Sequence, residues 1–213
     1  MSQRASTSRP YDPVKRAADV VAALALLVVT APLQLVVAVL VRAKLGSPVL
    51  FHQERPGLDG KIFTLRKFRT MLTVDEGRGI VDDEQRLTRF GRALRATSLD
   101  ELPALTNVVR GDMSMVGPRP LLVSYLGRYS ATQARRHEVR PGITGLAQVN
   151  GRNDVDWGRK LDLDVQYVDR RSLLLDASIL LRTVTVVVSR KGVSAQGHAS
   201  SPEFTGAPDG DAP

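Results

Sequence analysis

The sequence contains no cysteine. Disulfide bonds, thiolate metal sites and thiol nucleophiles are therefore excluded. Histidine occurs only three times, and the positions show none of the spacings of zinc ligands. Aromatic residues make up 5% of the chain, with a single tryptophan, whereas proteins that bind single-stranded nucleic acid usually need stacking rings. We therefore expect no nucleic-acid partner.

Acidic residues are fewer than basic ones: the chain has 22 Asp and Glu and 30 Lys and Arg, which gives a net charge of +8. Such an excess indicates anionic partners, either phosphate-bearing metabolites, nucleic acid or an anionic membrane surface. A generally basic, soluble surface is the alternative. The 213 residues suffice for one domain plus appendages.

Residues 20–41, VVAALALLVVTAPLQLVVAVLV, carry no charge. A straight helix of this length runs roughly 33 Å, enough to cross a hydrocarbon core of about 30 Å. The run is too long for a signal peptide, and Arg-Ala-Lys-Leu follows it where a signal peptide would have a small-residue cleavage site. We interpret residues 14–45 as a retained membrane anchor.

Proline at position 32 should kink this segment near its centre, because Pro32 removes a backbone donor and clashes with the preceding turn. Each arm is then about one leaflet long. Basic residues flank both ends: Arg9, Lys15, Arg16, Arg42 and Lys44. The positive-inside rule then favours no crossing direction, which fits a re-entrant hairpin that enters and leaves on one face. A proline-kinked span remains the alternative.

The rest of the chain predicts an α+β, mainly helical fold. Residues 49–55 and 62–71 alternate around a Pro-Gly/Asp-Gly turn and predict a small β-hairpin. Residues 100–110 predict one of several short helices. Residues 173–188 are apolar but contain Asp176 and Arg182, so they form either a core helix or an interfacial helix. We expect flexible segments at 1–13 and 192–213.

Two carboxylates stand side by side at Asp100 and Glu101. One interpretation is structural: Ser98 and Glu101 have the spacing of a capping box at a helix start, where the macrodipole favours acids. The other interpretation is chemical. Basic residues surround the pair in sequence and could converge on phosphates: Lys67, Arg69, Arg92, Arg95, Arg110 and Arg119. Carboxylates among them could hold Mg²⁺, or an Asp could attack phosphorus.

Four longer motifs carry a resemblance: KFRTM, SLDELPALTNVVRGDMSMVGPRPLL, RPGITGLAQVNGRN and GHASSPEFTG. With them the chain resembles the bacterial sugar transferases, the monotopic polyprenyl-phosphate phosphoglycosyl transferases, over residues 14–206. It is similar to the short form, which is the catalytic domain alone. The resemblance implies transfer of a sugar 1-phosphate from a UDP-sugar to polyprenyl (undecaprenyl) phosphate, with release of UMP, as the first membrane step of glycan assembly.

The resemblance also implies roles for residues. Asp100 would be the nucleophile that forms a covalent phosphosugar, and would contact Mg²⁺. Glu101 would be the second acid, as a base toward the lipid phosphate. The substrate phosphates would be bound by Lys67, Arg69, Arg95, Arg119 and Arg152.

The resemblance favours the re-entrant helix-break-helix anchor, kinked at Pro32. The catalytic domain, residues 46–191, would then lie on the cytoplasmic face of the bacterial inner membrane, in contact with the lipid bilayer. A homodimer is compatible with this arrangement. The family often has Ser before the kink proline, where this chain has Ala31. Thr30 could replace that hydroxyl.

Two other functions compete with this prediction. A membrane-tethered basic module would bind anionic lipid without catalysis, and its binding would survive Asp100→Asn. An Asp-dependent phosphatase would act on a lipid diphosphate and need no nucleotide sugar.

Overall fold

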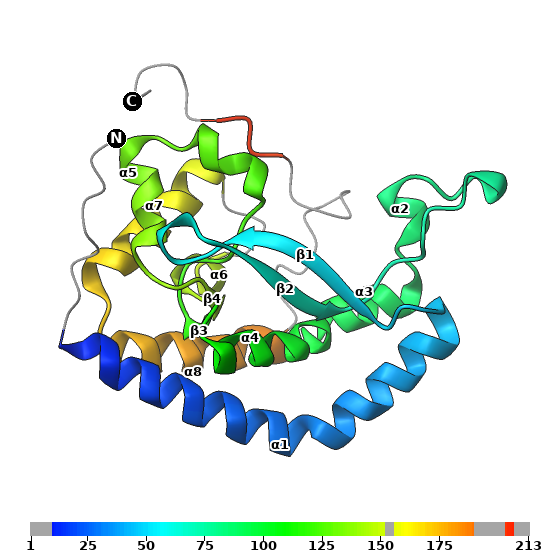
Figure 1. Ribbon diagram of the computed structural model, residues 1–213, viewed down its shortest axis with the longest axis horizontal. Coiled ribbons are helices and arrows are strands. Elements are labelled where there is room, and N and C mark those ends of the chain that lie inside the picture. The colour runs from blue at the N-terminus through cyan, green and yellow to red at the C-terminus, as the bar shows by residue number, and fades with distance from the viewer. Residues whose placement is uncertain (1–9, 152–155, 190–202, 207–213) are drawn as a thin grey trace.

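The computed structural model describes residues 10–151, 156–189 and 203–206, and it has the mainly helical fold with a small antiparallel sheet that the sequence predicts. Figure 1 shows a long bent helix below a body of short helices, with a β-hairpin across its centre. The elements are α1 (Tyr11–Leu45), β1 (Leu50–Pro56), η1 (Leu58–Gly60), β2 (Ile62–Phe68), η2 (Glu76–Arg78), α2 (Asp83–Arg86), α3 (Arg89–Ala96), η3 (Leu99–Ala104), α4 (Leu105–Arg110), β3 (Ser114–Val116), η4 (Val123–Arg128), α5 (Ala131–Ala134), η5 (Arg135–Glu138), β4 (Gly142–Thr144), α6 (Leu146–Val149), α7 (Trp157–Arg170) and α8 (Leu173–Ser189).

Pro32 lies inside α1 without ending it. We expected two helices separated by a break, and this was wrong: the structure has one helix that bends (Figure 1). The proline lacks an N–H for the preceding turn and displaces that turn sideways, which bends the helix. The Thr30 hydroxyl donates to the Leu26 carbonyl at 2.6 Å and accepts from Gln34 at 2.9 Å. Side chains on either side of Pro32 are thus bonded to each other across the bend.

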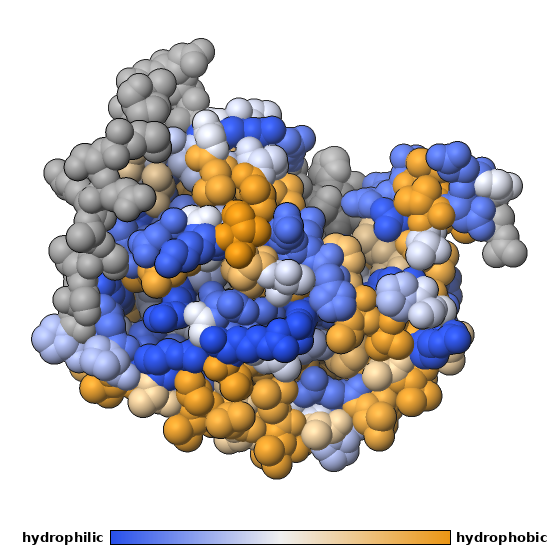
Figure 2. All heavy atoms as spheres, in the orientation of Figure 1, coloured by the Kyte–Doolittle hydropathy of each residue, from blue (hydrophilic) through white to orange (hydrophobic). Residues whose placement is uncertain are grey.

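The long helix packs on the body near its two ends. Ala23 is buried in the main core cluster, and Val41 and Leu45 are buried in a second cluster. Between them the helix is largely bare, with Val28 and Val29 each 75% exposed. Figure 2 shows apolar atoms gathered along the lower side of the molecule, where α1 runs, and polar atoms above them. By length and composition α1 could cross a membrane.

The predicted hairpin is confirmed. Strands β1 and β2 pair antiparallel, with Leu50 opposite Phe68 and Pro56 opposite Ile62. A second, parallel pair joins β3 to β4, with Ser114 opposite Gly142. This parallel pair tolerates no side chain at Gly142, because a Cβ there would lie 2.1 Å from the backbone nitrogen of Gly117.

Helix α8 is the segment that the sequence left open between a core and an interfacial helix. Its inner face buries Ile179 and Asp176. The Asp176 carboxylate accepts hydrogen bonds from Lys15 at 2.6 Å and from Tyr167 at 2.8 Å, and also from Tyr11. Its outer face exposes a row of large apolar side chains: Leu173, Leu174, Leu181 and Val184. The helix therefore has both a core face and an exposed apolar face.

The C-terminal segment that we expected to be flexible, 192–213, lies mostly outside the described residues, as does 1–9. Residues 203–206 are described, and Phe204 is 2% exposed there. Its ring packs against Tyr125, Tyr129 and Trp157, with centroids 5.5–5.7 Å away. The tail is therefore anchored to the helical body at this point.

Candidate active site

Asp100 and Glu101 lie in η3, directly after Ser98. Ser98 has a left-handed backbone, with φ of 56°, and its hydroxyl does not cap the helix. Of the two interpretations of the Asp100-Glu101 pair, the capping box between Ser98 and Glu101 is therefore wrong. A non-glycine residue in this region costs roughly 1–2 kcal/mol. The ion pairs that Glu101 makes with Lys67 and Arg119 help to offset that cost.

The carboxylate of Glu101 lies between two cations. Its Oε1 atom accepts a 2.7 Å hydrogen bond from Lys67 and another of 2.7 Å from Arg119. Burial alone would raise the pKa of Glu101, but Arg119 and Lys67 outweigh it and hold that pKa well below its usual range. The ionised form of Glu101 is thus favoured by its two ion pairs.

The carboxylate of Asp100 is in the opposite situation. It is 8% exposed and forms no hydrogen bond or ion pair with any residue that the structure describes. Burial and the charge of Glu101 raise the pKa of Asp100 to about 6, although Lys67, Arg119 and Arg95 oppose the rise. A nearly buried carboxylate without partners, bordered by three cations, is available to a ligand or a reacting atom.

Lys67 is positioned by strand β2 and by the buried side-chain amide of Asn107. Asn107 is 1% exposed; its side chain donates to the Thr64 carbonyl at 2.8 Å and accepts from the Arg66 backbone nitrogen at 3.2 Å. Asn107 lies on α4, which directly continues η3. This amide therefore ties the strand that carries Lys67 to the helical segment that carries Glu101.

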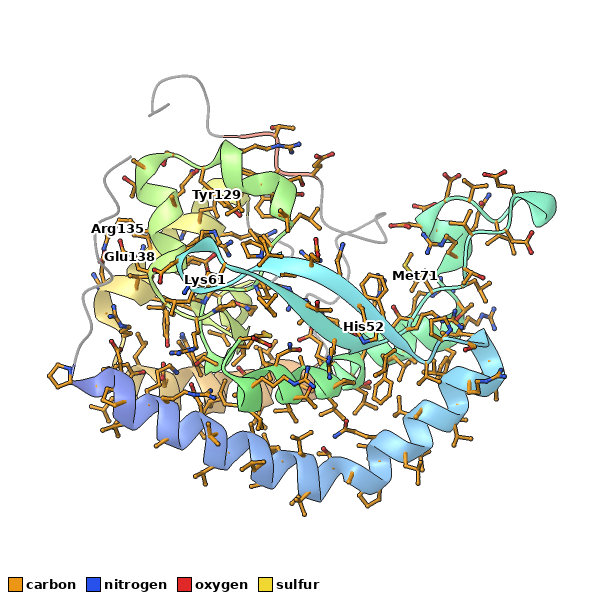
Figure 3. All side chains as sticks on the ribbon, viewed as in Figure 1. His52, Lys61, Met71, Tyr129, Arg135 and Glu138 are labelled. Atoms are coloured by element: carbon orange, nitrogen blue, oxygen red, sulfur yellow. The ribbon has the colours of Figure 1, made fainter. Side chains whose placement is uncertain are left out.

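Arg119 stands between two prolines after β3 and is exposed, while Pro118 and Pro120 are buried. Its backbone carbonyl accepts a 2.6 Å hydrogen bond from Arg136, whose guanidinium is 2% exposed and pairs with Asp164 at 2.8 Å. The Arg136 side chain also donates to the hydroxyl of Tyr129 at 3.2 Å. Figure 3 shows Tyr129 on the side of the hairpin turned away from α1. The buried Arg136 thus holds the loop that carries Arg119 in place through a backbone carbonyl of that loop.

Arg95 approaches the carboxylates from α3. Its Nε atom donates to the hydroxyl of Thr70 at 3.0 Å, and it is one of the cations that act on Asp100. The helix can come this close to Thr70 only because position 91 is glycine: a Cβ on Gly91 would lie 1.8 Å from the Thr70 carbonyl oxygen.

Two predicted phosphate-binding residues do not join this group. Arg69 is 7% exposed, and its guanidinium donates to the Ser47 carbonyl at 2.9 Å and to the Leu45 carbonyl. It therefore caps the C-terminal end of α1, and the structure does not bring it to the carboxylates. Arg152 lies outside the described residues.

One cation of the site was missed by the sequence reasoning. A cavity of about 80 Å³ lies against the site, and its charged lining consists of Arg55, Lys67, Glu101 and Arg119. Arg55 is opposite Phe63 in the hairpin register, so it faces the same side of the sheet as Leu65 and Lys67. The alternation of the two strands was visible in the sequence and could have identified Arg55.

The residues present fit a magnesium ion. Among the described residues there is no cluster of three or more carboxylate, histidine or cysteine side chains. Mg²⁺ commonly takes one or two carboxylates and completes its shell with water and substrate phosphates. Asp100 offers an unpaired carboxylate for this, whereas Glu101 is already occupied by Lys67 and Arg119.

Comparison with known proteins gives a consistent result. A family model described as bacterial sugar transferase matches residues 10–190. The chain is 52% identical, over 92% of its own length and 98% of the relative, to the uncharacterized sugar transferase EpsL of Bacillus subtilis. It is 44% identical to the UDP-glucose:undecaprenyl-phosphate glucose-1-phosphate transferase of Caulobacter vibrioides, over 80% of this chain and 68% of that one. It is 36% identical to the undecaprenyl-phosphate galactose phosphotransferase of Salmonella typhimurium, over 84% of this chain and 41% of that one.

Proposed function

Because the chain belongs to the bacterial sugar transferase family, we propose that it transfers a sugar 1-phosphate from a UDP-sugar to polyprenyl phosphate and releases UMP. The names of the relatives from Caulobacter and Salmonella support this reaction. The observation that carries the proposal is Asp100: a nearly buried carboxylate, free of partners in the described part of the chain, beside Lys67, Arg95 and Arg119.

Asp100 acts as the nucleophile of a two-step reaction. In the first step, one of its carboxylate oxygens attacks the phosphorus that carries the sugar. An O–P bond forms, the bridging P–O bond of the diphosphate breaks, and UMP leaves with that electron pair. In the second step, an oxygen of polyprenyl phosphate attacks the same phosphorus, and the bond to Asp100 breaks. The carboxylate is thereby regenerated.

The surrounding residues bind and orient. Glu101 fixes the ammonium of Lys67 and the guanidinium of Arg119, both 2.7 Å from its Oε1 atom, so that their charges face the phosphates in a set geometry. Arg95 contributes a further positive charge that acts on Asp100 from α3. Asp100 would hold Mg²⁺ together with the substrate phosphates, and the ion would supply further charge neutralisation there.

The anchor delivers this site to a lipid acceptor. Ala23, in the N-terminal half of α1, and Val41, near its C-terminal end, both pack on the same body, and the exposed, bent segment lies between them. If both ends stay with one water-facing domain, the bent middle enters one leaflet and returns. This supports the re-entrant arrangement over a straight span. We propose that the protein lies in this way at the cytoplasmic face of the bacterial inner membrane.

The exposed row on α8 supports the same placement. Leu174 is 85% exposed, Leu181 72% and Val184 63%. Apolar side chains in such a row are stable when they lie in the interface between headgroups and acyl chains. α8 therefore acts as an interfacial helix as well as a core helix.

Purified protein in lipid nanodiscs tests the reaction. With Mg²⁺, polyprenyl phosphate and a panel of UDP-sugars, we expect UMP from at least one donor, and none with Asp100→Asn. With donor alone, the wild-type chain should gain the mass of one phosphosugar at Asp100. No UMP from any donor, or lipid binding that is unchanged in a chain without turnover, would favour the membrane-tethered binding module. Release of inorganic phosphate without donor would favour the phosphatase.

A further inference from the structure

Arg55 is the cation of the site whose charge is not neutralised. Its Nη1 atom donates to the Pro120 carbonyl at 3.3 Å and its Nη2 atom to the side-chain oxygen of Gln53. Both acceptors are neutral. The Nε atom is buried and has no hydrogen-bond partner in the described part of the chain. Arg55 thus makes no ion pair within the ranges that the structure describes.

The cavity that Arg55 lines has an excess of positive charge. Arg55, Lys67 and Arg119 contribute three cations, and Glu101 contributes the only carboxylate of the lining. That carboxylate is already shared by Lys67 and Arg119. Burial, followed by repulsion from Arg119, lowers the pKa of Arg55 to about 10. A partly buried guanidinium without a counter-charge is unfavourable, and an anionic ligand in the cavity would offset that cost.

The cavity brings Arg55 next to Arg119. The Nη1 atom of Arg55 lies 3.3 Å from the carbonyl of Pro120, the residue after Arg119, and both arginines line the cavity with Lys67. Asp100 and Arg95 are not among the residues that line it. A phosphate bound in the cavity would therefore meet Arg55, while the phosphorus that bonds to Asp100 would lie outside the lining, one P–O–P bridge away.

We propose that Arg55 is a substrate-binding residue that contacts the phosphate leaving as UMP. This deepens the proposed function and rests on it. The guanidinium lowers the energy of the developing negative charge on the leaving phosphate and retains UMP until product release. Its existing contacts with Gln53 and Pro120 hold the guanidinium in place for that task.

The test is the affinity for UMP, compared with uridine, which lacks the phosphate. In nanodiscs, Arg55→Gln should weaken UMP binding by about 10- to 100-fold, as expected for a hydrogen bond to a charged group, and leave uridine binding unchanged. Arg55→Lys should keep part of the affinity, because it keeps the charge but loses the fork. Lys61→Gln, an exposed cation of the same hairpin, is the matched control and should bind UMP as the wild type does.

The kinetics give a second readout. With Arg55→Gln, the KM for the UDP-sugar should rise, and the phosphosugar on Asp100 should still form at saturating donor. If Arg55→Gln and Arg55→Lys both retain the wild-type ratio of UMP to uridine affinity, Arg55 only supports the Pro120 loop and the inference is wrong. A general loosening of the fold would weaken both ligands alike and would likewise overturn it. A wild-type chain that releases no UMP from any donor defeats the proposed function, whereas UMP affinity lost in Arg55→Gln would still establish the phosphate site.

Discussion

The guanidinium of Arg136 donates a 2.6 Å hydrogen bond to the backbone carbonyl of Arg119. Arg136 is kept in position by Asp164, 2.8 Å away, and both side chains are almost completely buried. The side chain of Arg119 in turn binds Glu101. The buried pair therefore positions a residue of the candidate site without itself reaching the cavity.

Asp164→Asn should be strongly destabilising, because it leaves the Arg136 cation buried without its counter-charge. We expect a loss of about 3 kcal/mol in unfolding free energy, measured by thermal or urea denaturation. Asp169→Asn is the matched control: Asp169 lies on the same helix, α7, and pairs with Arg135, but its side chain is 48% exposed. That exposed pair should contribute less than about 1 kcal/mol. Equal losses in the two variants would contradict the buried-pair argument.

Asp100→Asn should abolish turnover and yet stabilise the protein in magnesium-free buffer at pH 7.5. The folded-state pKa of Asp100, about 6, lies above the usual 3.8, so the fold disfavours the ionised form. The cost is small below pH 4, grows as the pH rises from 4 to 6, and levels off above pH 6 on the order of 2–3 kcal/mol. The neutral amide avoids it, and a rise in melting temperature of several degrees is expected. At pH 4.5 the difference should fall to about one third of its value at pH 7.5; a variant less stable than wild type at pH 7.5 would contradict the prediction.

The rate of UMP release should depend on the ionisation of Asp100. Because only the carboxylate attacks phosphorus, kcat/KM should fall about tenfold per pH unit below pH 6 at low Mg²⁺. Magnesium and the proton compete for the same carboxylate, so higher Mg²⁺ should move the inflection to lower pH. A profile whose inflection does not respond to Mg²⁺ would assign the ionisation to a group that does not contact the metal.

Gly91→Ala should damage the site through the backbone. Its new methyl group would lie 1.8 Å from the Thr70 carbonyl oxygen, so α3 must shift and carry Arg95 with it. We expect a loss of about 2–3 kcal/mol in stability together with a raised KM for the donor. Gly127→Ala is the control, since a Cβ there meets nothing within 4 Å, and its stability and kinetics should stay close to wild type.

The hairpin could be predicted from sequence because alternation and an Asp-Gly turn are local signals, and the bonds of β1 with β2 follow them. The backbone conformation of Ser98 could not be predicted in this way, because a capping box with Glu101 competes with the distant partners of the Glu101 carboxylate. Glu101 turns to Lys67 and Arg119, which lie 34 and 18 residues away in sequence, and Ser98 takes up a left-handed backbone instead of capping the helix.

The arginines show the same limit. Arg69 and Arg95 look alike in sequence, since each is a basic residue within or near one of the motifs that carry the family resemblance. Arg69 donates hydrogen bonds to the carbonyls after the end of α1, whereas the charge of Arg95 acts on Asp100. The difference arises from where α1 ends, which no local pattern near residue 69 encodes. Arg55, by contrast, needed only the strand register to be found on the same face as Lys67.

The attachment of α1 at both ends has a mechanical consequence. In the proposed re-entrant arrangement, a helix attached to the body at Ala23 and at Val41 would prevent the body from tilting or rising unless the whole bent segment left the lipid. The height of Asp100 above the acyl chains would then be constant. A lipid-linked phosphate that diffuses sideways in its leaflet would meet the carboxylate at one depth, so the search for the acceptor would be reduced from three dimensions to two.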